Sequence, residues 1–269
     1  MENPDSPMSD SALAAVLAQV AGDLLKVLRS ESQAGGLDGR QAGKKGDASS
    51  NELIIAELSR VRPEDAILSE ESADTTARLD ARRVWIIDPL DGTREYGLYD
   101  RDDWAVHIAL WDSQAAARSE GSGIIAAAVA LPAMGSVFST EEPSALPQIS
   151  TSNSGEPIRV LTSDSRPPAW ISALSEILPI EVRPMGSAGA KAMAVLRGEA
   201  DAYLHSGGQY EWDSAAPVGV VLAAGFHASR LDGSPLEYNQ PNPYLPDLVI
   251  CRPEIAGSIL EALAKIGAS

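Results

Sequence analysis

The feature that most constrains this chain is an apolar run that ends in two aspartates. Val84-Trp85-Ile86-Ile87 has the composition of a buried strand, and Asp88-Pro89-Leu90-Asp91-Gly92-Thr93 follows it directly. Proline has no amide hydrogen to donate to a sheet, so we expect the chain to turn just after Asp88. Gly92 and Thr93 then suit the first turn of a helix. The pattern predicts a strand, a tight turn that carries two carboxylates, and a helix.

Two carboxylates three residues apart on such a turn can converge on one point. The carbonyl oxygen of Leu90 can join Asp88 and Asp91 there, and hard oxygen ligands of this kind suit Mg²⁺. The free amides at the start of the helix, those of Gly92 and Thr93, can hold a phosphate at the same place. A simpler alternative is a turn in which both aspartates only cap the helix.

Three further acidic residues stand where an apolar segment meets a turn. Glu70 follows an apolar strand, Asp213 precedes an apolar helix, and Asp47 is expected to open a second helix. Taken singly, each fits a solvated loop or a helix cap. Clustered carboxylates raise one another's pKa values unless cations lie between them. Because active sites of α/β proteins gather at such junctions, the set together predicts a metal site.

Length, charge and cysteine content limit the classes of protein. The 269 residues suffice for one large α/β domain or two packed subdomains. A net charge of −17 argues against nonspecific nucleic-acid binding, which needs a basic surface. The same charge repels anionic substrates, so metal ions and a few local cations must reverse the sign at any phosphate site. Cys251 is the single cysteine, which excludes an internal disulfide.

The N-terminal segment is acidic and lacks the basic and apolar regions of a signal peptide. We find no apolar run of the roughly 20 residues that a membrane span needs. We therefore expect a cytoplasmic protein without a membrane partner.

The order of apolar segments predicts α/β layers of sheets packed with helices. Residues 1–8 look like a disordered leader, and a helix should run from Asp10 to about Arg29. The Gly-rich stretch 30–46 is expected to be a mobile loop, with Ser49 and Glu52 forming a capping box that opens the next helix. Short apolar runs predict strands at 66–68, 84–87, 104–111, 124–130, 137–138, 158–161, 180–183, 200–204, 226–229 and 248–251. Helices should lie near 168–177, 188–197, 213–224 and 253–267.

A stretch rich in Ser, Pro and Glu, residues 140–157, is a candidate boundary within the chain. It predicts an N-terminal metal-binding α+β subdomain, residues 9–150. A C-terminal α/β subdomain, residues 151–269, would complete the substrate pocket.

Three segments, in this order, resemble the inositol-monophosphatase superfamily: Glu70, Asp88 to Thr93, and Trp212 to Ala216. That superfamily includes inositol monophosphatases, fructose-1,6-bisphosphatases and bisphosphate nucleotidases. The resemblance extends from the first helix to Gly225. It implies an α-β-α-β-α sandwich, a small anionic phosphate metabolite as substrate, inhibition by lithium and, in many members, a homodimer.

The resemblance also implies roles for the acidic residues. Two or three Mg²⁺ ions would be held by five ligands, namely Glu70, Asp88, the Leu90 carbonyl, Asp91 and Asp213. Such ions would lower the pKa of a water and stabilise the leaving oxygen. Thr93, hydrogen-bonded to Asp47, would orient that water, so Glu70, Thr93 and Asp47 are the expected catalytic residues.

Arg94-Glu95-Tyr96 resembles the Gly-Thr-(Lys/Arg)-Glu-(Phe/Tyr) ending of CysQ-type 3′(2′),5′-bisphosphate nucleotidases. The segment 186–191 partly resembles their Gly-Ser-Ser-x-x-Lys, and 162–166 takes the place of a loop that lies near the nucleotide. The resemblance thus implies a substrate site formed by Gly92, Thr93, Arg94, Ser163, Lys191 and Asp213.

Three functions follow as alternatives. The first is hydrolysis of 3′-phosphoadenosine 5′-phosphate to AMP and phosphate, which Arg94-Glu95-Tyr96 favours. The second is an inositol phosphate or fructose bisphosphate substrate. The third is a non-catalytic metal-binding scaffold or metabolite sensor, which would have no need of Thr93. The three histidines and most tryptophans are expected to be structural, although Trp104 or Tyr96 could stack on a base.

Overall fold

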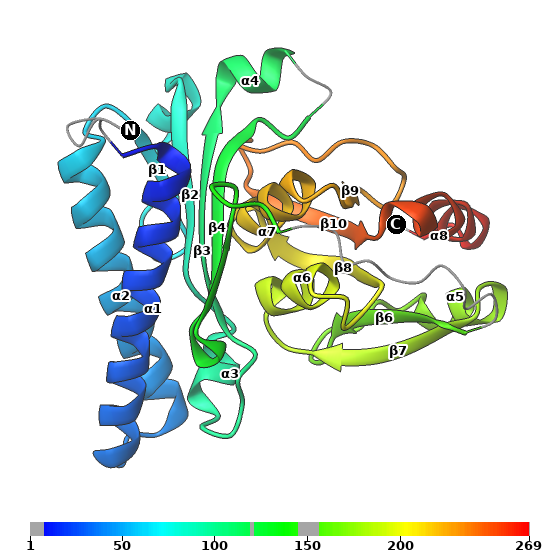
Figure 1. The fold of residues 1–269 in the computed structure, drawn as a ribbon, viewed down its shortest axis with the longest axis horizontal. Coiled ribbons are helices and arrows are strands. Elements are labelled where there is room, and N and C mark those ends of the chain that lie inside the picture. The colour runs from blue at the N-terminus through cyan, green and yellow to red at the C-terminus, as the bar shows by residue number, and fades with distance from the viewer. Residues whose placement is uncertain (1–7, 119–120, 145–155, 269) are drawn as a thin grey trace.

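The computed structural model describes residues 8–118, 121–144 and 156–268, and it has five layers (Figure 1). A pair of long helices, a five-stranded sheet, a middle pair of helices, a second five-stranded sheet and an outer pair of helices follow one another across the molecule. The predicted α-β-α-β-α sandwich is confirmed.

The first sheet has the strand order β1-β2-β3-β4-β5. Its strands are β1 (Ala66–Ser69), β2 (Arg83–Asp91), β3 (Ala105–Asp112), β4 (Ile124–Leu131) and β5 (Ser136–Ser139). Only β1 and β2 pair in parallel. Helices α1 (Asp10–Ala34) and α2 (Gly39–Val61) cover one face, where Leu17 and Leu25 pack with Trp85 and Ile87.

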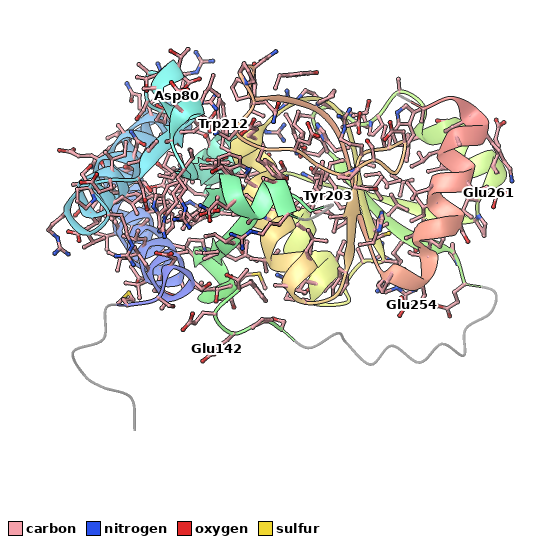
Figure 2. All side chains as sticks on the ribbon, turned by 90° about the horizontal axis from the view of Figure 1, so that it is seen from above. Asp80, Glu142, Tyr203, Trp212, Glu254 and Glu261 are labelled. Atoms are coloured by element: carbon pink, nitrogen blue, oxygen red, sulfur yellow. The ribbon has the colours of Figure 1, made fainter. Side chains whose placement is uncertain are left out.

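The second sheet has the order β7-β6-β8-β10-β9. Its strands are β6 (Ile158–Ser163), β7 (Ile180–Met185), β8 (Ala202–Tyr210), β9 (His227–Ser229) and β10 (Tyr244–Cys251). Helices α5 (Ile171–Ile177) and α8 (Pro253–Ile266) cover its outer face. Glu254 and Glu261 are exposed on α8 at the end of the molecule away from the first sheet (Figure 2).

The middle layer is made of α6 (Ala188–Leu196) and α7 (Glu211–Ala223). Both helices are apolar around most of their circumference, as expected for helices that are buried on two sides. Val84 of β2, Met193 of α6, Val220 of α7 and Leu248 of β10 belong to one core. The two sheets therefore share a hydrophobic interior.

The predicted mobile loop at residues 30–46 is wrong. Helix α1 continues to Ala34, and α2 begins at Gly39, where the Asp38 side chain accepts a hydrogen bond from the Gln41 amide (2.8 Å). The predicted capping box is wrong too, because Ser49, Glu52 and also Asp47 lie inside this helix.

Close packing explains why a glycine-rich segment is helical here. Gly39, Gly43 and Gly46 are spaced at i, i+4 and i+7 and therefore lie on one face of α2. A Cβ atom on Gly39 would lie 2.4 Å from the carbonyl oxygen of Gly97, and one on Gly43 would lie 2.7 Å from Cγ2 of Thr93. The glycines let α2 approach the short helix α3 (Thr93–Gly97) at backbone distance.

The prediction that the strand ends in a turn just after Asp88 is also wrong, because the chain forms a bulge there and the strand continues. Strand β2 continues to Asp91, and Pro89 lies in a bulge: Asp88 pairs with His107, whereas Asp91 pairs with Ala105. The bulge accommodates the missing amide hydrogen of proline. It also brings the side chains of Asp88 and Asp91 toward the same place.

Helix α1 is long and apolar enough to cross a membrane by length and composition, which the sequence analysis did not anticipate. A core helix of a soluble protein meets the same criterion. Leu17, Ala21 and Leu25 of α1 are indeed buried against the first sheet.

The other predicted strands and helices are present, and their ends lie within a few residues of those predicted, except that β8 continues six residues beyond the predicted end at Leu204, to Tyr210. The helix α4 (Ser113–Arg118) and the 3₁₀ turns η1 (Thr76–Asp80) and η2 (Pro132–Met134) were not predicted. Most of the expected leader and residues 145–155 of the expected boundary lie outside the described residues.

We expect Gly43→Ala to lower the free energy of unfolding by about 1–3 kcal/mol, because the new methyl group overpacks the contact with Thr93. Gly257→Ala is the matched control, since a Cβ atom there meets nothing within 4 Å. It should raise stability by about 0.5–1 kcal/mol, as alanine does within a helix. Urea unfolding curves measure both, and equal effects of the two substitutions would contradict the packing role of Gly43.

Candidate active site

Three aspartates meet where the first sheet faces the middle layer. Asp88 and Asp91 come from the β2 bulge and Asp213 from the first turn of α7, and each offers a carboxylate oxygen within 4.8 Å of the others. Asp88 and Asp91 are buried. The structure thus brings together three of the ligands that the resemblance implies.

Glu70 stands beside this cluster because β1 pairs in parallel with β2. Its amide donates to the Ile87 carbonyl (3.2 Å), and its side chain hydrogen-bonds Asp88. The side chain reaches solvent, but the protein around it and the carboxylates of Asp213 and Asp91 raise its pKa to about 7. Burial, with Asp91 next, likewise raises the pKa of Asp213 to about 7.

The Leu90 carbonyl, Thr93 and Asp47 form a second group next to the aspartates. The Thr93 hydroxyl lies 3.1 Å from the Leu90 carbonyl oxygen and within reach of the Asp47 carboxylate. Burial, and then the charges of Glu71 and Glu70, raise the pKa of Asp47 to about 8. Among the described residues, Oδ1 of Asp47 is buried and has no hydrogen-bond partner.

Asp91 is held more firmly than the other carboxylates. Its Oδ2 accepts hydrogen bonds from the Ser187 hydroxyl and the Gly189 amide (2.7 Å) and lies 3.2 Å from Nε2 of His107. Burial alone would raise the pKa of Asp91, but His107, Ser187 and Gly189 outweigh it and lower that pKa. The pKa of Asp91 is therefore lowered, whereas the pKa values of its neighbours Glu70 and Asp213 are raised.

Sequence reasoning did not assign a role to Ser187, although a serine before an apolar helix is a recognisable cap. Its hydroxyl accepts from the Ala190 amide (2.9 Å) and so starts α6 while it donates to Asp91. His107 was expected to be structural, and it lies between Asp91 and the Trp212 carbonyl oxygen, 3.1 Å from its Nδ1.

The residues expected to contact substrate lie in three different settings. Gly92 and Thr93 begin α3, and Gly92 has a φ of 85° with Ser187, Asp103 and Trp104 packed around it, so that only glycine fits. Arg94 is half exposed at the rim and pairs with Asp164 (2.8 Å).

Ser163 and Lys191 make mainly internal contacts. Ser163 is buried, and its hydroxyl accepts from the Arg166 amide (3.2 Å). Lys191 is buried as well, and burial lowers its pKa to about 8. Its ammonium group donates to the carbonyls of Gly186 and Ser187, the latter at 2.9 Å. In this arrangement Lys191 fixes the turn that holds Asp91.

The donor set fits a hard divalent cation. The converging atoms are carboxylate oxygens, which Mg²⁺ and Mn²⁺ prefer, and the Leu90 carbonyl between Asp88 and Asp91 offers another oxygen. Burial and the crowding of negative charge raise the pKa values of Glu70, Asp88 and Asp213, which is the behaviour expected of anions that lack their counter-ion. Asp88, Asp91, Asp213, Glu70 and the Leu90 carbonyl are the groups that would hold such ions.

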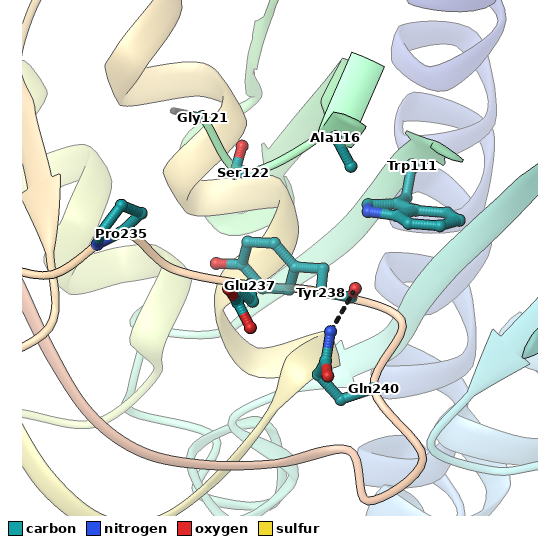
Figure 3. A pocket seen from close by; sticks show the side chains of 8 residues that line it. All are labelled: Trp111, Ala116, Gly121, Ser122, Pro235, Glu237, Tyr238 and Gln240. Atoms are coloured by element: carbon teal, nitrogen blue, oxygen red, sulfur yellow. Dashed lines mark hydrogen bonds between the residues drawn. The ribbon is translucent and has the colours of Figure 1, made fainter. Parts of the chain in front are cut away.

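A separate hollow of about 300 Å³ lies near the end of β3 (Figure 3). None of the clustered carboxylates lines it. Gln240 donates to the Tyr238 carbonyl across its wall (3.2 Å), and the other lining residues include Trp111, Ala116, Ser122 and Glu237. We therefore place the candidate active site at the acidic cluster.

The raised pKa values predict how the metal-free protein responds to pH. Glu70 and Asp213 titrate near 7 and Asp47 near 8 in the fold, but near 4 in the unfolded chain. Between about pH 5 and 8 the folded state therefore binds more protons, so stability should fall as pH rises. We expect the Tm of protein treated with a chelator to decrease over this range, and saturating Mg²⁺ to remove most of the decrease.

Asp88→Asn is the matched variant, because it removes one of the crowded charges while an amide oxygen can still accept from the Leu90 amide. Its metal-free Tm should depend less on pH than that of the wild type. A metal-free Tm that rises with pH between 5 and 8 would refute this account of the cluster.

Comparison with known proteins agrees with this geometry. A curated 3′-phosphoadenosine 5′-phosphate phosphatase of Mycobacterium leprae is 52% identical over 264 residues, which cover 96% of this chain and 95% of the relative. One from Mycobacterium bovis is 55% identical over 227 residues and covers 82% of each chain. The 3′(2′),5′-bisphosphate nucleotidase CysQ of Escherichia coli K12 is 28% identical, with 74% and 80% covered.

Solved structures show the same fold. A staphylococcal IMPase-II superposes with a TM-score of 0.75 at 21% identity, covering 96% of this chain and 97% of that one. Mycobacterium tuberculosis SuhB gives 0.70 at 23% identity, with 95% and 96% covered. The Inositol monophosphatase family matches residues 9–268. The acidic cluster, the layered fold and this match across nearly the whole length place the chain in the inositol monophosphatase family.

Proposed function

We propose that this protein is a Mg²⁺-dependent phosphatase that hydrolyses the 3′-phosphate of 3′-phosphoadenosine 5′-phosphate and releases AMP and phosphate. The observation that best supports metal-dependent hydrolysis is the convergence of Asp88, Asp91 and Asp213 beside Glu70. The substrate is supported by relatives of that name that are more than half identical to this chain. Cytoplasmic location and a homodimer remain predictions.

Backbone amides and carboxylates of this chain can position the reacting phosphate and the metal ions. The first amides of α3, those of Gly92 and Thr93, have no acceptor within the helix and can bind the oxygens of the reacting phosphate. Bound Mg²⁺ would supply Lewis-acid stabilisation of the charge that develops on the phosphate and the leaving oxygen. Asp91, kept ionised by His107 and Ser187, gives the site a fixed negative charge at which to hold such an ion.

Thr93 and Asp47 form a path for the proton of the attacking water. The Thr93 hydroxyl can accept from the water and donate to Asp47. Burial and the charges of Glu71 and Glu70 raise the pKa of Asp47 in the metal-free protein, and nearby cations would lower it again, so that the carboxylate would be ionised and able to take up the proton. The water attacks phosphorus opposite the 3′-oxygen of AMP, and that oxygen leaves with a proton from solvent. The reaction needs no covalent intermediate with the protein.

The substrate is tested by phosphate release in the presence of Mg²⁺. We expect kcat/KM for 3′-phosphoadenosine 5′-phosphate to exceed that for inositol 1-phosphate and fructose 1,6-bisphosphate by at least about tenfold, or about 1.4 kcal/mol in transition-state binding. A flat or sugar-favouring profile would move the assignment to a sugar phosphatase. Absence of release from all three would leave only a metal-binding role.

The proton path is tested by a pair of substitutions. Thr93→Ala removes the hydroxyl and should lower kcat by about 100-fold or more, the usual contribution of a positioned proton-transfer group. Thr93→Ser keeps the hydroxyl and should retain most of kcat. Mg²⁺ binding, measured by calorimetry, should differ little among the three proteins. Equal losses of kcat in both variants would mean that Thr93 acts through its methyl contact with Gly43.

A further inference from the structure

An aromatic cluster lies beside Asp213, one of the clustered aspartates. The rings of Tyr210 and Trp212 are stacked, with centroids 4.8 Å apart and planes inclined by 6°. Tyr244 meets Tyr210 edge-on at 5.7 Å. Tyr210 and Tyr244 are each 41% exposed, so part of each ring faces solvent.

This cluster is tied directly to a candidate metal ligand. The backbone amide of Tyr210 donates to Oδ2 of Asp213 (2.6 Å), and Trp212 is the residue just before Asp213. A nucleotide whose phosphate is bound at the aspartates can therefore extend toward these rings.

The other aromatic rings near the site are not accessible. Tyr96, Trp104 and Tyr203 are buried, with at most 1% of each side chain exposed. The earlier expectation that Trp104 or Tyr96 stacks on a base is therefore wrong, since a base cannot reach either ring. Of the described aromatic residues close to Asp213, Tyr210 and Tyr244 offer the exposed surface.

A positive charge lies next to the rings. Arg166 is exposed, and its guanidinium donates to the Gly208 carbonyl (2.9 Å), while the Gly208 amide donates to the Tyr244 hydroxyl (3.1 Å). Among the described residues Arg166 forms no close ion pair with a carboxylate, whereas Arg94 pairs with Asp164. The charge of Arg166 does reach Asp213, whose pKa is raised by burial and Asp91 and is lowered in part by Arg166. Arg166 therefore keeps free donors beside the aromatic cluster.

We propose that Tyr210, backed by Trp212, and Arg166 bind the nucleoside 5′-phosphate part of the substrate, with the purine stacked on the Tyr210 ring and the 5′-phosphate on the Arg166 guanidinium. This inference rests on the proposed function and names the residues that distinguish a nucleotide from a sugar phosphate. Sugar phosphates have no π face to stack, and an arginine fork matches the geometry of a phosphate.

The ring is tested by Tyr210→Leu, with Tyr210→Phe as the matched control. Both variants keep the backbone amide that Asp213 accepts from. We expect Tyr210→Leu to raise KM for 3′-phosphoadenosine 5′-phosphate by about tenfold or more, within the range that stacking of one base supplies. Tyr210→Phe should stay within about twofold of the wild type. The loss in kcat/KM on inositol 1-phosphate should be smaller by about tenfold.

The charge is tested by Arg166→Met, with Arg118→Met as a control that removes the same charge from an exposed site on α4. Arg166→Met should weaken turnover of 3′-phosphoadenosine 5′-phosphate by about tenfold or more. It should weaken turnover of adenosine 3′-phosphate, which lacks the second phosphate, far less. Arg118→Met should affect both substrates equally and slightly.

The outcomes separate this inference from the proposed function. A wild-type protein with no preference for the nucleotide would overturn the proposed function itself. A wild-type preference that survives in Tyr210→Leu would leave the function in place and overturn the role of the ring. If Arg166→Met lowers turnover of 3′-phosphoadenosine 5′-phosphate and of adenosine 3′-phosphate by the same factor, the proposed contact of Arg166 with the 5′-phosphate is wrong.

Discussion

The structure depends on one buried anion, the carboxylate of Asp91. It lies on the first sheet, yet its hydrogen bonds come from Ser187 and Gly189 at the start of α6. Through His107 it is also linked to the Trp212 carbonyl at the start of α7. An ionised carboxylate inside a protein is tolerated only when it is fully hydrogen-bonded or paired. The need to satisfy Asp91 therefore fixes both middle helices against the first sheet, and with them Asp213.

Much of the architecture could be predicted from the sequence because apolar spacing is a strong signal. Runs such as 84–87 and 124–130 are strands, and the apolar stretches at 188–197 and 213–224 are helices buried on two sides. The acidic residues were found for a related reason: Asp88, Asp91 and Asp213 each interrupt an apolar element at its end, where a buried charge is conspicuous.

The failures share a physical cause, which is that the deciding contact is distant in the chain. The glycines at 39, 43 and 46 predict a loop from sequence alone, but they lie in α2, where their small size lets the helix pack closely against α3. Pro89 looks like a strand end until the bulge opposite β3 is seen. The role of Ser187 depends on its hydrogen bond to Asp91, and that of Lys191 on its hydrogen bonds to the carbonyls of the turn at 186–187. The interest of Tyr210 depends on its contact with Asp213. The spacing of residues within a short segment cannot identify partners that come from distant parts of the chain.

The link between Tyr210 and Asp213 has a consequence for how this enzyme can change during evolution. The bond that supports the candidate metal ligand uses the main chain of Tyr210, whereas the exposed ring is side chain. Every residue except proline supplies the same amide hydrogen. With the proposed role of the Tyr210 ring in substrate binding, substitution at this position would alter which molecules are accepted while the bond to Asp213 is kept, so that new substrate preferences would be reachable by single mutations.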